Sequence, residues 1–593
     1  MCQASQSAIS LDAVRQQVEK ILAHGLFIRS ERMARFLRFV VQQALAGKAA
    51  DLKEYLIGVE VFDRRSSYDP RVDPIVRVEA RRLRSKLKAY YESAGRSDSV
   101  LVEFVSGSYQ PHFSLRSAAE LAPPPQPPAR PAPDPVTIAV LPFVNLSANS
   151  EDEYFSDGLT EELIHALTKL GEMRVVAWDS AARLRGRQQD VAAIRHQLNV
   201  GTALTGSVRI AGPTLRVRAQ LIDTADGVYL WSETFDRQLE DVFAIQEEIA
   251  RAIVKTLRLQ LSGGADLGLD SRGRTTISAY DWYLRGRHFG HRRSPDGLRR
   301  ALQCFEAAVE ADPSSGLAHA GLADACSVLV DYGLANPDDV MPRARAAALR
   351  ALSLAPDLAE AHVSLAFIRG LYEWEWEDAE RLYLRALALN PGYASAYHWL
   401  GTDHYALTGR FEEAMATVET AIALDPLSSI IREGRAYTMM LMRRFDAAIA
   451  AYAEILRTDP TFYKAYTSMG RAYAQQGRYA EALEMLEKGR SMAGDMPTIL
   501  GAIGQVSGLA GDRERARGLL AQLHEQARHA YVPGTCFALI HQGLGERERA
   551  LDWMERSCAR RELPVAACKV HPAYDDLRGE PRFQAILRTM RLA

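Results

Sequence analysis

The sequence predicts a multidomain α+β protein: a small helical domain with a β-hairpin, a small α/β domain, and a long α-solenoid of paired helices. The chain has 593 residues, too many for one compact core, since domains usually hold about 100–200 residues. A proline-rich run, LAPPPQPPARPAPDP at 121–135, separates a basic N-terminal part from the rest. A phrase that recurs every 34 residues fills the C-terminal half and predicts the solenoid.

The composition is that of an ordinary globular protein, with 47% hydrophobic and 25% charged residues. No apolar run approaches the roughly 18 residues of a membrane-spanning helix, and the first residues lack the apolar core of a signal peptide. The six cysteines contain no C-x-x-C pair, so no zinc or dithiol site is expected. We therefore expect a cytoplasmic protein with no membrane span and no metal or other cofactor.

Charge is unevenly distributed along the chain. Residues 1–118 carry 19 Lys and Arg against 13 Asp and Glu, a net charge of +6. The remaining 53 basic and 61 acidic residues give a net charge of -8. A basic N-terminal domain on an acidic body suggests that the two ends bind different partners, with a polyanion the candidate for the basic end.

The N-terminal domain is predicted to contain two helices, a basic helix and a hairpin. Apolar residues at steps of three and four predict a helix over 33–45, a shorter helix over 54–62 and a third over 75–91. Strands are expected over 100–105 and 109–113, joined by a Ser-Gly-Ser turn. On the third helix the expected core residues are Val76, Ala80, Leu83, Leu87, Tyr90 and Tyr91, and the expected cationic stripe is Arg77, Arg81, Arg84 and Lys88. This is the order of elements in a winged helix.

Two segments in this domain resemble the OmpR/PhoB-type winged-helix effector domain over roughly residues 30–113. They are Ala80-Arg-Arg-Leu-Arg-Ser-Lys-Leu87 and the hairpin ending Val105-Ser-Gly-Ser-Tyr109. In that family the matching helix enters the major groove of double-stranded DNA. The resemblance implies DNA contacts for Arg77, Arg81, Arg82 and Arg84, and Lys88 lies nearer the helix end and the DNA backbone. A solvated helix face and a protein-docking winged helix are the two alternatives.

Residues 136–262 alternate between strand-like and helical segments. Strands are expected over 136–144 and 173–178, helices over 156–167, 191–198 and 239–261, and a hairpin over 203–210 and 214–222. Asp157 and Gly158 fit a helix cap better than a ligand pocket, and Thr160 is a second cap candidate. The phrases AVLPF at 139–143 and YFSDGL at 154–159 resemble the TolB amino-terminal-like domain. In bacteria that domain often follows either a DNA-binding domain or a class III adenylate cyclase.

Residues 277–593 contain the repeat. Its markers are Phe411, Phe445, Tyr479, Arg513 and Arg547, each expected near a helix start, and Pro313, Pro356, Pro391, Pro426 and Pro460, each expected to end a helix. The unit from Ala465 to Ala482 resembles the tetratricopeptide repeat, and we count about eight repeats, one of which carries an insertion around 317–356. An unrelated α-solenoid is the alternative. The resemblance implies a concave surface that binds a protein or peptide partner.

No motif for catalysis is found. There is neither a phosphate-binding loop nor a nucleophile turn, and His524 and His529 are one residue too far apart to share a helix face as zinc ligands. We therefore expect a winged-helix DNA-binding domain at 1–118, a linker at 119–135, an α/β domain at 136–262 and a repeat array with a C-terminal cap at 277–593. The predicted function is a DNA-binding transcriptional regulator and not an enzyme. The alternatives are a non-DNA-binding signalling adaptor assembled through the repeats and an enzyme hidden in the middle domain.

Overall fold

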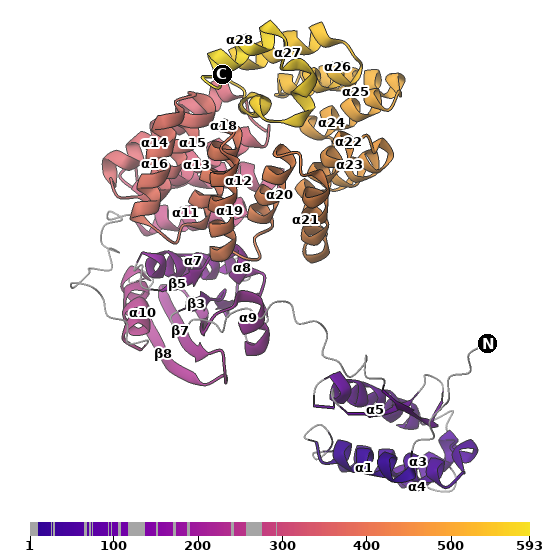
Figure 1. Cartoon of the computed structure of the whole chain (residues 1–593). Helices are drawn as coiled ribbons and strands as arrows, with labels where there is room; N and C mark the ends of the chain where they lie inside the picture. Colours follow the sequence, from indigo (N-terminus) through magenta and orange to yellow (C-terminus); the bar gives the residue numbers. More distant parts are fainter. Residues whose placement is uncertain are drawn as a thin grey trace. The chain divides into compact units, whose positions relative to one another are not determined.

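The computed structural model describes residues 10–24, 27, 30–64, 68–69, 73, 75–92, 94–95, 98–104, 108–116, 137–149, 152–169, 173–186, 190–238, 242–256, 276–291 and 293–593. The chain forms two compact units, Met1–Pro131 and Ala132–Ala593 (Figure 1). The predicted linker at 119–135 lies outside the described residues. In the described part of the chain, no helix is both long enough and apolar enough to cross a membrane.

The first unit contains helices followed by a hairpin, in the predicted order. Its elements are α1 Leu11–Leu22, α3 Glu31–Leu45, the short 3-10 turn Ala49–Asp51, α4 Glu54–Phe62, α5 Ile75–Glu92, β1 Val100–Phe104 and β2 Pro111–Leu115. The two strands are antiparallel, with Val100 opposite Leu115 and Phe104 opposite Pro111. Residues 105–107 of the predicted turn lie outside the described residues. Helix α1, which the sequence analysis did not predict, begins after Ser10, whose hydroxyl accepts from the amide of Ala13.

One buried carboxylate joins the two ends of this unit. Asp98, just before β1, is 4% exposed and accepts from Gln17 of α1 at 2.6 Å and from Tyr90 of α5 at 2.7 Å. Lys20 of α1 forms an ion pair with it. Burial opposes ionisation, but the hydrogen bonds from Lys20, Gln17 and Tyr90 together lower the pKa of Asp98. The ionised carboxylate therefore holds α1 against α5 and the start of the hairpin.

We predict that Asp98→Asn lowers the free energy of unfolding of this unit by about 1.5–3 kcal/mol, because charge-assisted hydrogen bonds are lost. A group whose pKa is lowered on folding stabilises the folded state above its ordinary pKa of 3.8, and this stabilisation disappears as the pH falls through the folded-state value. Acid unfolding of the wild-type chain and the variant, followed by circular dichroism, checks this. Equal stability at neutral pH would contradict it.

The first unit has a core of its own, made from all three predicted helices, α1 and the hairpin. Phe36, Leu37, Leu83 and Val102 are each at most 1% exposed. We predict that residues 1–118 fold alone, because this core shares no residue with those of the second unit. A cooperative thermal transition of the isolated segment checks the prediction. A segment that is unfolded or aggregated in isolation would show that it needs the rest of the chain.

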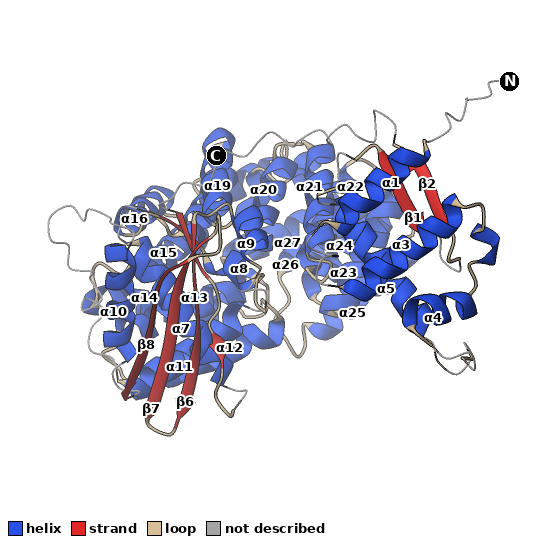
Figure 2. Cartoon of the chain, turned by 90° about the horizontal axis from the view of Figure 1, so that it is seen from below, coloured by secondary structure: helices blue, strands red, loops and turns tan. Residues whose placement is uncertain are grey.

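The second unit begins with an α/β domain built around one sheet. Its elements are β3 Thr137–Val140, β4 Val144–Asn145, α7 Glu153–Thr168, β5 Arg174–Val176, α8 Trp178–Ala182, α9 Val191–Leu198, β6 Thr202–Ala211, β7 Thr214–Asp223, β8 Tyr229–Gln238 and α10 Val242–Thr256. The strand order is β5-β3-β6-β7-β8, with β4 beside β6. Strand β3 is parallel to β5 and β6, whereas β6, β7 and β8 form an antiparallel meander (Figure 2). The predicted helix over 191–198 is confirmed, and β8 was not predicted.

The repeat array follows as helix pairs. Its helices are α11 Ile277–His291, α12 Pro295–Ala311, α13 Gly316–Asp331, α14 Pro337–Leu354, α15 Ala359–Phe367, α16 Trp376–Leu389, α17 Ala394–Trp399, α18 Ala406–Thr408, α19 Phe411–Leu424, α20 Ser429–Leu441, α21 Phe445–Thr458, α22 Tyr463–Gln475, α23 Tyr479–Ala493, α24 Pro497–Leu509, α25 Arg513–Gln526, α26 Gly534–Gly543 and α27 Arg547–Ala559. Two π-helical segments, η5 Ile368–Tyr372 and η6 Leu400–Tyr405, continue α15 and α17. In the described residues these helices make eight pairs, in agreement with the predicted count. The insertion near 317–356 is absorbed by longer helices: α14 has 18 residues, whereas α21 has 14.

The repeat markers act as helix boundaries. Each of the five predicted start markers is the first residue of its helix, from α19 to α27. Two residues before each of them the chain has a left-handed backbone, at Gly409, Arg443, Gly477, Gly511 and Gly545. Glycine adopts this conformation without a steric cost, which explains its recurrence. Each marker proline stands two residues after the end of a helix, as at Leu424 and Pro426.

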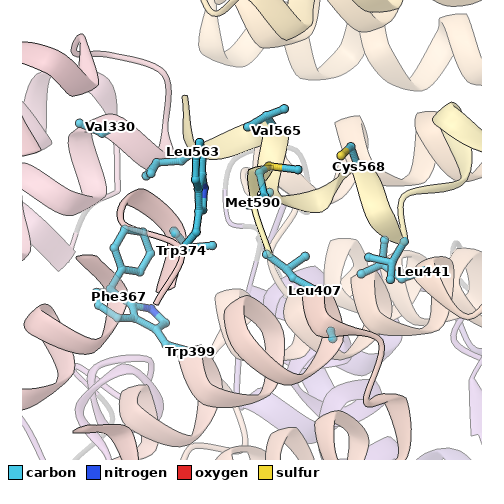
Figure 3. Close-up of a cluster of buried hydrophobic side chains, with 14 of the residues drawn as sticks. Val330, Phe367, Trp374, Trp399, Leu407, Leu441, Leu563, Val565, Cys568 and Met590 are labelled. Atoms are coloured by element: carbon cyan, nitrogen blue, oxygen red, sulfur yellow. The ribbon is translucent and has the colours of Figure 1, made fainter. Parts of the chain in front are cut away.

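The C-terminal segment folds back onto earlier repeats. It comprises η7 Leu563–Lys569, η8 Pro572–Leu577 and α28 Pro581–Thr589. The indole nitrogen of Trp376 donates to the carbonyl of Met590 at 2.8 Å, and the guanidinium of Arg443 donates to the carbonyl of Val570 at 2.8 Å. Figure 3 shows Leu563 and Met590 in one apolar cluster with Trp374 and other side chains of the earlier repeats.

Repeats far apart in the sequence also meet directly. Gly333, after α13, lies against Pro533, before α26, so closely that a Cβ on the glycine would be 3.3 Å from the proline ring. Solenoid repeats usually contact only their neighbours and leave a concave surface open. In this chain the array closes on itself, and its C-terminal segment lies against the inner helices of earlier repeats.

We predict that Gly470→Trp destabilises the second unit by about 1–3 kcal/mol or more, because the site has no room for a side chain. A Cβ there would lie 2.8 Å from Leu486 Cγ and 2.9 Å from the carbonyl of Ala482. Gly518→Trp is the matched control, since it lies on an exposed helix face with no atom within 4 Å of its Cβ position. Thermal unfolding of both variants checks this, and equal melting temperatures would show that Gly470 is not a packing position.

Candidate functional site

Helix α5 of the first unit has one buried face and one cationic face. The predicted core residues of this helix are all buried, with Val76 fully so and Leu83 and Tyr90 each 1% exposed. Arg77, Arg81, Arg82 and Lys88 are exposed, and Arg84 is half-buried. The helix is thus fixed by its apolar face while a row of basic side chains remains in solvent.

The basic residues differ in what they contact inside the unit. Arg77 forms an ion pair with Glu54 of α4 at 2.8 Å, and Arg82 pairs with Glu79 on its own helix at 2.7 Å. Arg84 donates to the carbonyl of Ser108, between β1 and β2, with a separation of 3.4 Å. Arg77 and Arg84 therefore help to position neighbouring segments as well as adding positive charge.

Arg81 is different, because it forms no ion pair with any residue that the structure describes. Its guanidinium is exposed on the central turn of the helix. Sequence reasoning missed an apolar group on this surface: Val78 is 42% exposed and lies one helical turn before Arg81 and Arg82. Its spacing from the core residues, two positions after Val76, is the feature that could have revealed it.

Asp157 and Gly158 of the middle domain do not cap a helix, so that prediction is wrong, and the same applies to Thr160. Helix α7 begins at Glu153, four residues earlier, which places all three inside it. Asp157 is buried and pairs with Arg185 at 2.5 Å and with His288 of α11 at 3.1 Å.

Gly158 lies in direct contact with the first repeat helix. A Cβ at this position would be 2.5 Å from a methyl carbon of Leu284. Both Asp157 and Gly158 line a cavity of about 250 Å³ with Glu161, His288 and other residues. The weaker of the two sequence hypotheses, a pocket, is therefore closer to the structure. Asp157 of α7 pairs with His288 of α11 across this pocket, so the pocket is part of the junction between the two helices.

This junction continues along the middle domain. The amide of Ala177 donates to the carbonyl of Leu424 at 3.0 Å, and the amide of Ser180 donates to Asp425 at 2.8 Å. Arg183 pairs with Asp459 at 2.7 Å. The predicted domains 136–262 and 277–593 thus pack together within one compact unit.

No metal site is found in the described part of the chain, where no group of three or more His, Cys, Asp and Glu residues is placed to hold an ion. His524 instead packs against Phe537, with ring centroids 4.7 Å apart.

Comparisons with known proteins identify two kinds of domain. Tetratricopeptide repeat families match residues 371–429 and 439–506, so the chain carries tetratricopeptide repeats. The second domain of the HilA/YgeH-like transcriptional regulators matches residues 134–252. The middle domain is therefore similar to a domain of transcriptional regulators. The resemblance to the TolB amino-terminal-like domain and to the OmpR/PhoB-type winged helix stays a prediction.

Two relatives match longer stretches. The chain is 38% identical over 217 residues to "Putative adenylate cyclase 3" of Rhizobium meliloti, which is 36% of either chain. It is 22% identical over 304 residues to the transcriptional regulator HilA of Salmonella typhimurium, which is 50% of this chain and 52% of HilA. The chain thus spans about a third to about half the length of these relatives.

Solved structures give similarity to repeat proteins. A tetratricopeptide repeat protein from Parabacteroides merdae aligns over 45% of this chain and all of its own, with 17% identity and a TM-score of 0.33. The type IV pilus biogenesis factor PilW aligns over 35% of this chain and 95% of its own, with 20% identity and a TM-score of 0.29.

Proposed function

We propose that the protein is a DNA-binding transcriptional regulator whose first unit is a winged helix with α5 as its recognition helix. The observation that carries this proposal is the cationic face of α5, exposed beside a fully packed core face. The major groove of DNA admits one α-helix, and an exposed arginine can bind guanine O6 and N7 together. The hairpin after α5 stands where a winged helix has its wing.

The contacts inside the unit suggest a role for each basic residue. Arg81, with no intramolecular ion pair among the described residues, is the best candidate for reading a base edge, and Arg82 lies beside it. Arg77, Arg84 and Lys88 are assigned to phosphates, because phosphate contacts position a protein without specifying sequence. Val78 is placed to contact a thymine methyl group.

The similarity of residues 134–252 to a domain of transcriptional regulators supports this proposal from a different part of the chain. The 22% identity to HilA, which is named as a transcriptional regulator, points in the same direction. Double-stranded DNA is thus the proposed partner of the first unit. A protein or peptide partner is proposed for the repeat array, because tetratricopeptide repeats commonly bind proteins.

The second candidate function is that of a signalling adaptor that does not bind DNA. The tetratricopeptide repeats favour it, because such repeats commonly bind proteins. In that case the basic face of α5 would dock an acidic protein surface. The two functions differ in what the first unit binds, so one binding experiment distinguishes them.

We predict that Arg81→Ala weakens binding to a preferred duplex by roughly 1–3 kcal/mol and relaxes sequence preference, because a base contact is lost. Lys88→Ala is expected to weaken binding to all sequences alike, because a phosphate contact is lost. It should also reduce the slope of log affinity against log salt concentration by about one unit. The measurement is binding of the intact chain to a duplex selected from a random pool and to its scrambled version, at two salt concentrations.

Arg15→Ala is the matched control, since it removes one exposed positive charge from α1, where the arginine is 64% exposed and pairs with Asp12 on its own helix. This control is expected to leave sequence preference unchanged. If the wild-type chain binds neither duplex at low salt, or if Arg81→Ala alters neither affinity, the DNA proposal fails. The adaptor function would then replace it.

A further inference from the structure

The closed repeat array encloses a cavity of about 290 Å³. Inner helices of the array form most of its wall, and the segment from Leu563 to Tyr574 borders the remaining side. Ligand pockets in proteins usually hold about 300–1,000 Å³, so this volume suits a small molecule and not an extended peptide. Both π-helical segments contribute to the wall, through Leu371 and through Thr402 and Asp403. Such segments often mark functional sites.

One part of the wall is acidic. Asp331, Asp403 and Glu433 line it together with Lys464. The ammonium of Lys464 lies 3.9 Å from Asp331 and 4.0 Å from the centre of the Tyr332 ring, so it offsets the charge of Asp331. Burial, followed by the charge of Asp331, raises the pKa of Asp403, and burial also raises the pKa of Glu433.

Another part of the wall is basic. The guanidinium of Arg471 donates to the carbonyl of Thr498 at 3.1 Å and forms no ion pair with a described residue. Burial lowers the pKa of His571 to about 3, so this neighbour is neutral at pH 7. Arg293 lines the cavity as well and likewise has no ion pair in the described part of the chain.

Unpaired buried charges are costly. The cavity is lined by ionisable groups of both signs, three carboxyl groups on one side of the balance and Lys464, Arg293 and Arg471 on the other. Aromatic residues also line the cavity, among them Trp399, Tyr437 and Tyr463. A molecule that carries a cationic group and an anionic group on a short body would satisfy both.

We propose that this cavity is a binding site for a small zwitterion of the amino-acid class. Its ammonium group lies among Asp331, Asp403 and Glu433, where it also faces aromatic rings, and its carboxylate accepts hydrogen bonds from Arg471. The bound molecule also contacts the segment that closes the array, so its binding strengthens the closure. This site is independent of the DNA-binding proposal.

The first test uses the intact wild-type chain and the proteinogenic L-amino acids, one at a time at millimolar concentration. We expect at least one of them to raise the melting temperature and to bind at one site in isothermal titration. Its decarboxylated amine and its deaminated acid are expected to bind about tenfold more weakly or worse, since each lacks one charged group. Absence of binding by every amino acid, or equal binding of either analogue, would overturn the proposal without any variant.

The second test locates the site. Asp403→Asn and Arg471→Gln are each expected to weaken binding of that amino acid about tenfold or more while the chain stays folded. Arg457→Gln is the matched control, because Arg457 is 75% exposed and does not line the cavity. Unchanged affinity in both cavity variants would place the molecule elsewhere and overturn the proposal.

Discussion

The closure of the repeat array depends on its C-terminal segment, which shares an apolar core with the earlier repeats and adds a few polar contacts to them. Arg443 makes two of these polar contacts, to the carbonyl of Val570 and to the carboxylate of Asp575. It stands where other repeats have glycine, with φ of 60°, a conformation that costs a side-chain-bearing residue roughly 1–3 kcal/mol. The contacts with the C-terminal segment offset that cost. A residue that departs from the repeat pattern thus adds polar contacts that help to hold the array closed.

Closure also explains why the middle domain and the array behave as one compact unit. The domain contacts two separate regions of the array, α11 through Asp157 and Gly158, and the end of α19 through Ser180 and Asp425. In an open solenoid these regions could move relative to each other, since each repeat would be held only by its neighbours. In the closed array they are held at fixed positions, so one rigid domain can bond to both.

Local features of the fold could be predicted from the sequence, whereas its long-range contacts could not. The period of 34 residues gave the helix starts at Phe411 and its equivalents, because glycine and proline act on the backbone within a few residues. The π-helical segments have no periodic pattern in the sequence that would predict them. The same is true of the contact between η7 and the earlier repeats. The contact between Trp376 and Met590 joins residues 214 positions apart, and no local rule connects them. The pairing of Asp157 could not be predicted for a related reason, since its partner His288 belongs to the array, 131 positions away.

The same distinction applies to the candidate DNA-binding face. Helical periodicity separates the core residues of α5 from its basic residues, and this was predictable. It does not show which charges the protein already uses: Arg77 is paired with α4, and Arg84 contacts Ser108 between the two strands of the hairpin. Among equally basic side chains, one without an ion pair to any described residue has the least to lose on binding, because no such pair must be broken first. For this reason we assign the proposed base contact to Arg81 and not to its neighbours, a choice that composition and spacing alone could not make.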